Sequence, residues 1–525
     1  MNKSINFMGA YFIRLPYYFY LVTLFFIFLT GFSFFLTASD NYIFNFLKYS
    51  KTIFFTFFQA TTATFFSSVL GFIFSLILYL SGKNQRLISA FLNFCFILPV
   101  IFVSFGIIFF YSSNGVLSKF LSLFSLDYDF KIFSFAGIIY VTSYFNIAFN
   151  ANFFFRKLVN LPDNYIKILK SNNISFWTAV RLQIRGYLFQ GYRSIVILTL
   201  IFCASNFTIL YLLSGSPNLV TIELSIYQSI IFNADLYSGI TLGMIQLILM
   251  LFLSSLIMFN QNYDQSFNFN KSSMTRFPKN NLISLAFYVI VFYFLIPFLI
   301  LIKGLFNFNA QIILSIGFLN SILNSLMIST LSVLLSVFIS LSALYTYRSF
   351  IEKNSKLQKF TFLSITILLF IPSLALSSII FYLNFNLNFI FSNFLIVSVI
   401  NSFFITPIVF VFLSSKFIEN YFYESKQCII LNISPFIRLI KIDIPKIKNE
   451  LVLIISAVFV LSLGDLTSIT IFNDSSFRTI PLFISQLYNN YKYDDAFFIL
   501  SLFIISLFFI MYLPSKFLNR NAYIR

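Results

Sequence analysis

Residues 281–302 read NLISLAFYVIVFYFLIPFLILI and contain no charged side chain. A helix of about 20 apolar residues is long enough to cross the hydrocarbon core of a bilayer, so this stretch is predicted to span a membrane. Further stretches along the chain have the same character. The expected spans lie near residues 16–37, 53–80, 87–111, 132–154, 188–213, 236–258, 281–302, 320–346, 360–383, 391–413, 450–472 and 496–514. The sequence therefore predicts an all-α polytopic membrane protein with about 12 transmembrane helices, which has the lipid bilayer as a partner.

The composition agrees with this prediction and excludes several classes of protein. Of the 525 residues, 59% are hydrophobic and 10% are charged, whereas a soluble domain carries about 25% charged residues. The chain has no histidine, which excludes imidazole acid–base chemistry and imidazole metal ligands. Its three cysteines lie far apart, without the spacing of a zinc site. We therefore expect no catalytic residue, no metal site and no cofactor, and an integral membrane enzyme is a poorly supported alternative.

The basic residues indicate how the chain is oriented in the membrane. Lys and Arg number 34 against 16 acidic residues, which gives a net charge of +18. If the N-terminus is cytoplasmic and the spans alternate in direction, 27 of the 34 basic residues fall in cytoplasmic segments. The positive-inside rule describes this distribution, so both termini are predicted to be cytoplasmic. Because the basic residues are spread over every inner loop, we expect no nucleic-acid partner.

The two halves of the sequence contain matching segments. Residues 221–230 read TIELSIYQSI and residues 479–488 read TIPLFISQLY, with identical residues at an offset of 258. Residues 173–175 and 432–434 both read NIS, at an offset of 259. Six spans per half would place both halves in the same orientation, as a parallel repeat, and chance similarity between apolar segments is the alternative. The predicted organisation is a first half at residues 1–258, a polar cytoplasmic linker at 259–280 and a second half at 281–525.

Two inner loops, at residues 155–187 and 414–449, have apolar positions interleaved with basic residues. A basic amphipathic helix lying on anionic lipid is one interpretation of such a loop. The two loops occupy the same place in both halves, between the fourth and fifth spans. This favours docking on a partner with two equivalent surfaces. Trp177 is the only tryptophan and lies in the first of these loops, where we expect it to act as an interfacial anchor.

These inner loops resemble the coupling loops of ATP-binding-cassette (ABC) importer permeases. The family's pattern is Glu-Ala-Ala, three residues, glycine, nine residues, isoleucine, one residue and Leu-Pro. In the second loop, Ile442 and Ile444-Pro445 stand at the family's distance from Asn432, which takes the glycine position. Asparagine is the next best residue after glycine for a left-handed backbone turn. Asn173 takes this position in the first loop, where the rest of the motif is degenerate.

Longer segments resemble fused permeases for thiamine and thiamine pyrophosphate. These segments are residues 202–230 and 461–488, whose most distinctive pieces are TIEL at 221–224, SLGD at 462–465 and FRTIP at 477–481. The resemblance implies a type I ABC importer permease fold, with both permease halves in one chain in the bacterial inner membrane. It further implies two copies of a cytoplasmic ATP-binding subunit, a periplasmic substrate-binding protein and a small-molecule substrate, thiamine or thiamine pyrophosphate. Ferric-iron permeases share the fused architecture and are the alternative within this family.

The chain lacks the phosphate-binding loop of ATPases. Gly82-Lys83 is followed by Asn84, and no Gly-x-x-x-x-Gly-Lys-Ser/Thr occurs in the sequence. We therefore expect ATP hydrolysis on a partner subunit and do not expect the chain to be an enzyme. A twelve-span secondary transporter is the alternative from another class of protein. Such transporters usually have their longest inner loop between the two halves, whereas the longest inner loops here follow the fourth and tenth expected spans.

Asp465 is the only acidic residue in the interior of an expected span, and an ionisable residue there is a functional candidate. Asn206 is its counterpart at an offset of 259. We predict that Asp465 and Asn206 line the substrate path, where a carboxylate would suit the cationic thiazolium ring of thiamine. The alternative is that Asp465 caps a helix break at Gly464.

The remaining candidate residues interact with partner proteins. The predicted ATPase-coupling residues are Asn173, Ile174, Ser175, Trp177, Arg181, Asn432, Ile433, Ser434, Arg438, Ile442 and Pro445. The outer segments at 214–235 and 473–495 carry acidic residues and are predicted to face the binding protein, with ordinary solvated loops as the alternative. The residues predicted to face that protein are Glu223, Gln228, Arg478 and Gln486.

Overall fold

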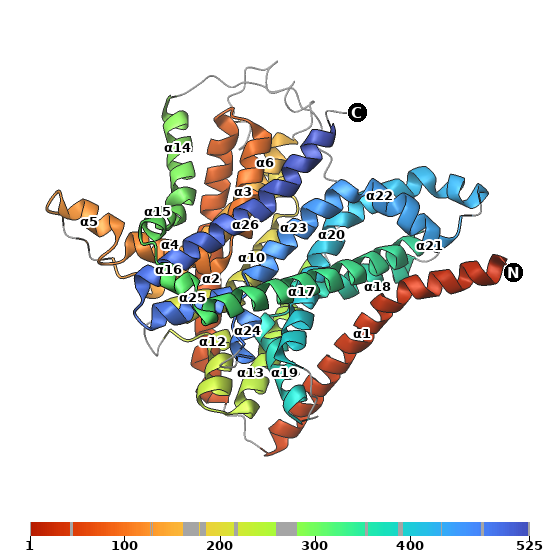
Figure 1. Cartoon of the computed structure of the whole chain (residues 1–525), viewed down its shortest axis with the longest axis horizontal. Helices are drawn as coiled ribbons and strands as arrows, with labels where there is room; N and C mark the ends of the chain where they lie inside the picture. Colours follow the sequence, from red (N-terminus) through yellow and green to blue (C-terminus); the bar gives the residue numbers. More distant parts are fainter. Residues whose placement is uncertain are drawn as a thin grey trace. The chain divides into compact units, whose positions relative to one another are not determined.

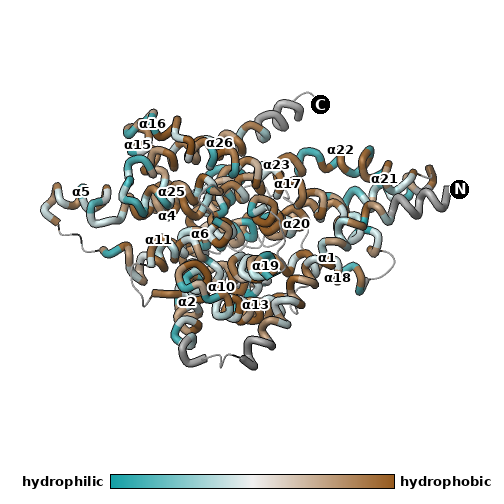
Figure 2. Tube along the Cα trace, turned by 60° about the horizontal axis from the view of Figure 1, so that its bottom comes forward, coloured by the Kyte–Doolittle hydropathy of each residue, from teal (hydrophilic) through white to brown (hydrophobic). Residues whose placement is uncertain are grey.

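The structure is a computed structural model, and every regular element in its described residues is a helix (Figure 1). The described residues are 2–41, 46–126, 128, 130–160, 178, 185–214, 219–258, 281–351, 355–386, 392–431, 433–473 and 477–522. The predicted linker at 259–280 therefore lies outside them. Figure 2 shows hydrophobic residues along much of α2 (Phe46–Leu80) and α20 (Asn393–Ile430) and hydrophilic residues at α22 (Ile444–Lys446). The all-α fold class is confirmed.

The helices form two compact units that do not coincide with the two halves of the sequence. Unit 1 comprises Met1–Asn45, Ser225–Leu251 and Lys303–Arg525, and unit 2 comprises Phe46–Leu224 and Phe252–Ile302. Unit 1 thus combines most of the second half with the first helix of the chain. Unit 2 combines most of the first half with the first helix that follows the predicted linker. Each unit therefore contains the helix that opens the other half of the sequence: unit 1 contains α1 (Asn2–Asn41), and unit 2 contains α14 (Asn281–Leu295).

Unit 2 is built around the contact between α2 and α6 (Phe135–Val159). A Cβ atom on Gly71 of α2 would lie 2.6 Å from the Cβ atom of Asn150 on α6, so only glycine permits this approach. Small residues allow such close packing of membrane helices. The other helices of this unit are α3 (Gln85–Ile97), α4 (Val100–Tyr111), α5 (Val116–Ser122), α9 (Arg185–Phe189), α10 (Tyr192–Ala204), α11 (Phe207–Leu213), α14 (Asn281–Leu295) and η3 (Ile296–Phe298).

Unit 1 is built around the contact between α17 (Ile316–Ser349) and α20. Buried serines on α17 donate hydrogen bonds across this contact, from Ser332 Oγ to the carbonyl of Ser398 and from Ser340 Oγ to the carbonyl of Thr406, both at 3.0 Å. The polar groups of the two helices thus satisfy one another without water. The other helices are α1 (Asn2–Asn41), η2 (Gln228–Phe232), α16 (Ala310–Ile313), α18 (Ser355–Thr366), η4 (Ile367–Phe370), α19 (Ser373–Asn386), α21 (Pro435–Arg438), η5 (Leu439–Asp443), α22, α23 (Lys448–Leu463), α24 (Thr467–Ile471), α25 (Ile480–Asn489) and α26 (Tyr493–Ala522).

Three helices contain residues of both units. They are α12 (Ile222–Tyr227), α13 (Leu236–Met258) and α15 (Leu299–Phe306). The unit boundaries at residues 224, 251 and 302 fall within them.

Two of the expected spans are broken at a proline. The expected span at 87–111 is divided between α3 and α4 at Leu98-Pro99. The expected span at 360–383 is divided between the helical segment Lys356–Phe370 and α19, which meet at 95° beside Pro372. Proline lacks a backbone N–H and disfavours a helical conformation in the preceding residue. The breaks thus have a local cause.

The described residues contain nine helices long and apolar enough to cross a membrane, or up to eleven if each of two bent pairs counts as one span. One bent pair is α10 with α11, which turn by 44°. The other is the pair that meets beside Pro372. The expected span at 132–154 corresponds to α6, which carries the buried polar residues Asn146 and Asn150 and is not among the eleven. The chain is therefore a multi-pass membrane protein.

The internal repeat is also visible in hydrogen bonds within each unit. The amide of Ile222 donates to Thr56 Oγ1 at 3.0 Å, from the first turn of α12 to α2. The amide of Ile480 donates to Ser325 Oγ at 2.8 Å, from the first turn of α25 to α17. The two repeated segments at 221–230 and 479–488 thus begin a helix in the same way, held by a hydroxyl group of the second helix of their half.

Candidate functional site

The second inner loop continues from α20 as a short helical segment formed by α21, η5 and α22. Ser434 begins this segment, because its side chain accepts a hydrogen bond from the amide of Ile437 at 3.4 Å. Pro435 occupies the first helical position, where its missing N–H costs nothing. The five residues of η5 form a π-helical turn, a feature frequent at functional sites.

This helical segment exposes three apolar side chains and buries two charged ones. Phe436, Ile437 and Ile440 are 53%, 47% and 45% exposed, whereas Arg438 and Asp443 are buried. A water-exposed helix would normally have the opposite arrangement. The segment therefore presents an apolar surface, which we call the loop face and define as Phe436, Ile437 and Ile440. A contiguous exposed apolar surface is typical of an interaction site.

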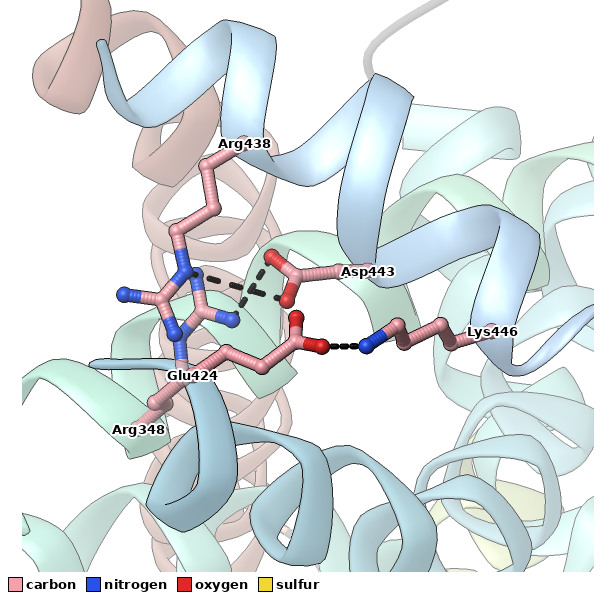
Figure 3. A network of polar contacts seen from close by, with 5 residues as sticks. All are labelled: Arg348, Glu424, Arg438, Asp443 and Lys446. Atoms are coloured by element: carbon pink, nitrogen blue, oxygen red, sulfur yellow. Dashed lines mark hydrogen bonds and ion pairs between the residues drawn. The ribbon is translucent and has the colours of Figure 1, made fainter. Parts of the chain in front are cut away.

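The buried side of the segment is held by an ion pair with α17. Arg348 Nη1 lies 2.7 Å from Asp443 Oδ2, and the two side chains are 4% and 2% exposed (Figure 3). Arg438 Nε lies 3.8 Å from the other oxygen of the same carboxylate. A second pair joins Lys446 to Glu424 at the end of α20. Asp443 is thus the single acidic group between two buried guanidinium groups.

Only some of the predicted coupling residues lie in the part of the chain that the structure describes. Ile433, Ser434, Arg438, Ile442 and Pro445 are described, and Arg438 is buried and does not belong to the loop face. The others, Asn173, Ile174, Ser175, Trp177, Arg181 and Asn432, lie outside the described residues. The sequence did not predict the partnership of Arg348 and Asp443. A basic residue at the end of a span indicates the orientation of the span and does not identify a partner. The pair has no local signal in the sequence.

Asp465 and Asn206 occupy equivalent positions, each beside a break between two helices. Asp465 follows α23, and its carboxylate accepts hydrogen bonds from the amides of Thr467 at 3.1 Å and Ser468 at 3.3 Å, and from both hydroxyl groups. Asn206 follows α10, and its Oδ1 atom accepts a hydrogen bond from the amide of Ile209 at 3.4 Å. Both residues therefore cap the helix that follows the break. The structure thus contains the capping arrangement that the sequence offered as the alternative.

A small pocket with a volume of about 10 Å³, room for about one water molecule, lies beside Asp465 within unit 1. The hydroxyl groups of Ser462 and Thr479 line it and have no hydrogen-bond partner among the described residues. Asn401 also lines the pocket, and its Oδ1 atom accepts a hydrogen bond from Ser468 Oγ at 2.7 Å. Buried hydroxyl groups without a partner are rare and are usually met by water or a ligand. Asp465 thus stands in a polar environment inside unit 1.

One of the residues predicted to face the binding protein, Glu223, is buried. Glu223 lies in the first turn of α12 and is 0% exposed, so its side chain cannot face an external protein in this conformation. Packing of the repeated segment buries this residue, and its role as a contact of a binding protein stays a prediction. Gln228, Arg478 and Gln486 are partly exposed. Their role as contacts of a binding protein stays a prediction.

The chain thus has the features of an all-helical transport permease, with matching segments in both halves of its sequence and a loop that carries an exposed apolar surface. Its relatives are thiamine transport system permease proteins. The protein of this name, ThiP, from Haemophilus influenzae is 28% identical over 460 residues, which cover 85% of this chain and 84% of the relative. The ThiP protein of Escherichia coli is 23% identical over 87% of this chain and 86% of its own length. That of Brucella suis is 23% identical over 76% of this chain and 74% of its own length.

These relatives confirm the resemblance to fused ABC importer permeases of the thiamine type. They are named as transport permeases and not as enzymes. The similarity extends over most of the chain and so includes both halves of the sequence. No family model matches the chain. No solved structure matches it either.

Proposed function

We propose that this chain is the permease subunit of a binding-protein-dependent ABC importer and forms the path through which thiamine or thiamine pyrophosphate crosses the inner membrane. The similarity to thiamine transport permeases over 85% of the chain carries this proposal. ATP is hydrolysed on a separate cytoplasmic subunit, present in two copies, and a periplasmic protein delivers the substrate. Both termini of the permease are cytoplasmic. The halves at 1–258 and 281–525 each contribute one coupling loop and one side of the path.

The loop face is the surface through which the second half contacts an ATP-binding subunit. Three exposed apolar side chains within one short helical segment support this assignment, since water is an unfavourable neighbour for them. Lys441 and Lys446 are exposed on the same segment and give its rim a positive charge. A protein interface commonly has an apolar centre and a polar rim. The first inner loop has the equivalent role in the other half.

Uptake of radiolabelled thiamine tests the proposed function. The chain is expressed in a bacterial strain without its own thiamine permease, together with the ATP-binding subunit and the binding protein from the organism of the chain. We expect ATP-dependent accumulation of thiamine that unlabelled thiamine pyrophosphate competes away. Ferric iron is the control substrate. Uptake of iron without uptake of thiamine would assign the chain to the alternative substrate of this architecture.

Asp465 provides a negative charge along the path for the positively charged thiazolium ring. We expect Asp465→Asn to reduce thiamine uptake about tenfold, which corresponds to about 1.4 kcal/mol. Asparagine caps helices about as well as aspartate, so the substitution removes the charge and retains the cap. The measurement is the initial rate of thiamine uptake at equal permease level in the membrane, determined by immunoblot.

Asp465→Glu is the matched control for this experiment, because it retains the negative charge beside the pocket. This control is expected to transport thiamine at close to the wild-type rate. Full uptake by Asp465→Asn would show that Asp465 is only a helix cap.

A further inference from the structure

The ion pair between Arg348 and Asp443 joins two parts of the chain with different proposed tasks. Arg348 is in the last turn of α17, a membrane span. Asp443 is the last residue of η5, within the segment that carries the loop face. The two residues are 95 positions apart in sequence, and their side chains meet at 2.7 Å. This ion pair therefore connects the cytoplasmic loop directly with a transmembrane helix.

Aromatic rings close this site from the side of α20 and α17. The Cζ atom of Arg348 lies 4.7 Å from the ring centre of Phe417 and 5.3 Å from that of Tyr345. Tyr421 lies over both guanidinium groups, at 5.7 Å from Arg348 and 5.2 Å from Arg438. The rings attract the cations and exclude water from them. Water is therefore a poor replacement for Asp443 as the partner of Arg348. We expect the two side chains to stay paired when either helical segment moves.

The charges at the site do not balance. Arg348 and Arg438 share the single carboxylate of Asp443, and the Nε and Nη2 atoms of Arg438 have no hydrogen-bond partner among the described residues. Removal of the Asp443 charge would leave two buried cations facing each other, which repel in a medium of low dielectric. Asp443 is consequently the residue on which the whole connection depends.

The pair between Glu424 and Lys446 lies nearby but has a different environment. The side chain of Lys446 is 47% exposed, so solvent screens this interaction. It also connects the loop with α20 and not with α17 (Figure 3). This second pair therefore offers a matched comparison, since it is an ion pair of the same loop without a buried link to α17.

We infer that Asp443 and Arg348 are positioning residues that transmit movement of the second coupling loop to α17. The inference rests on the proposed function, because it assumes that an ATP-binding subunit moves this loop. When the loop face is displaced, the buried ion pair pulls the inner end of α17 with it. The loop face binds the partner, and the ion pair makes that binding effective for transport. A mere stabilising role would affect the amount of protein and leave the coupling unchanged.

The test uses the full complex of permease and ATP-binding subunits in proteoliposomes, with binding protein and radiolabelled thiamine. The quantity measured is the number of thiamine molecules transported per ATP hydrolysed. For Asp443→Asn we expect the ATP-binding subunit to co-purify as with the wild type, because the loop face is intact. Transport per ATP is expected to fall at least tenfold. Asp443→Glu, which retains the charge, is expected to recover most of this loss, and Glu424→Gln, which weakens the pair with Lys446 instead, is expected to behave as the wild type.

Several results would overturn the inference. An unchanged ratio of transport to ATP hydrolysis in Asp443→Asn would show that the pair has no part in coupling. Loss of the ATP-binding subunit from this variant would show that the pair only shapes the docking surface. If Asp443→Asn does not accumulate in the membrane, Arg348→Lys takes its place, and an unchanged ratio there has the same meaning. A wild-type complex that transports no thiamine would instead contradict the proposed function.

Discussion

Replacing Ile437 and Ile440 together with aspartate is expected to abolish co-purification of the ATP-binding subunit and to lower thiamine uptake to the level of a strain without the permease. Both residues belong to the loop face and are nearly half exposed, so the substitutions create no buried charge within the free permease. In the complex, however, the two carboxylates would lie in an apolar contact without partners. Burial of an unpaired charge is unfavourable by several kcal/mol. We expect at least a hundredfold weaker association, equivalent to about 2.7 kcal/mol.

The measurement is the amount of ATP-binding subunit recovered with the permease from detergent-solubilised membranes. Tyr491→Asp is the matched control, since Tyr491 is 80% exposed and lies in a turn on the predicted outer side. Its φ of 62° is a conformation that aspartate tolerates better than most residues, so this control is expected to fold normally. Normal recovery of the ATP-binding subunit with the double variant would favour the other interpretation of the loop, in which its apolar side rests on lipid.

The second large effect is expected at Gly106, where Gly106→Leu should reduce the amount of permease in the membrane more than tenfold. A Cβ atom at this position would lie 2.5 Å from the carbonyl oxygen and 2.6 Å from the Cα atom of Pro297. These are backbone atoms, which cannot move aside as a flexible side chain can. The contact joins α4 to η3, the segment that follows α14. The substitution would therefore separate the opening helix of the second half from the rest of unit 2.

Immunoblots of membrane fractions measure this effect, and the temperature at which the detergent-solubilised permease aggregates gives a second readout. Gly186→Leu is the matched control, because no heavy atom of the described residues lies within 4 Å of a Cβ placed on Gly186. We expect this control to accumulate normally. An equal amount of protein in both variants would mean that α4 and η3 do not need to approach each other so closely.

The sequence predicted the elements of the fold better than their arrangement. Long apolar stretches such as 281–302 indicate spans on their own, because the bilayer imposes a minimum helix length. The breaks at Pro99 and Pro372 had a local signal as well, but the apolar character of the surrounding residues concealed it. The composition of the two units was not readable from the sequence. It depends on contacts between helices hundreds of residues apart, and no short motif specifies them.

The candidate site was predictable only where its residues act locally. The second inner loop was identified from its alternation of apolar and basic residues, and Ser434 and Pro435 have familiar roles at a helix start. The burial of Glu223 could not be foreseen, because an acidic residue in a predicted outer segment looks solvated until the helix is packed. The partnership of Arg348 and Asp443 was equally hidden, since it spans 95 positions and depends on the close approach of α17 to the loop.

Each unit contains the opening helix of the other half of the sequence, and this has a consequence for the synthesis and folding of the protein. Tyr17 of α1 donates a backbone hydrogen bond to Ser342 of α17, a residue synthesised 325 positions later. Helix α1 therefore completes its packing only after most of the chain that follows it has been inserted in the membrane. Unit 2 is likewise completed only when α14 has been inserted. Neither unit can form from one half of the sequence alone, because each contains residues of both halves. Two chains produced from a gene divided at the linker would therefore fold only if they associated with each other.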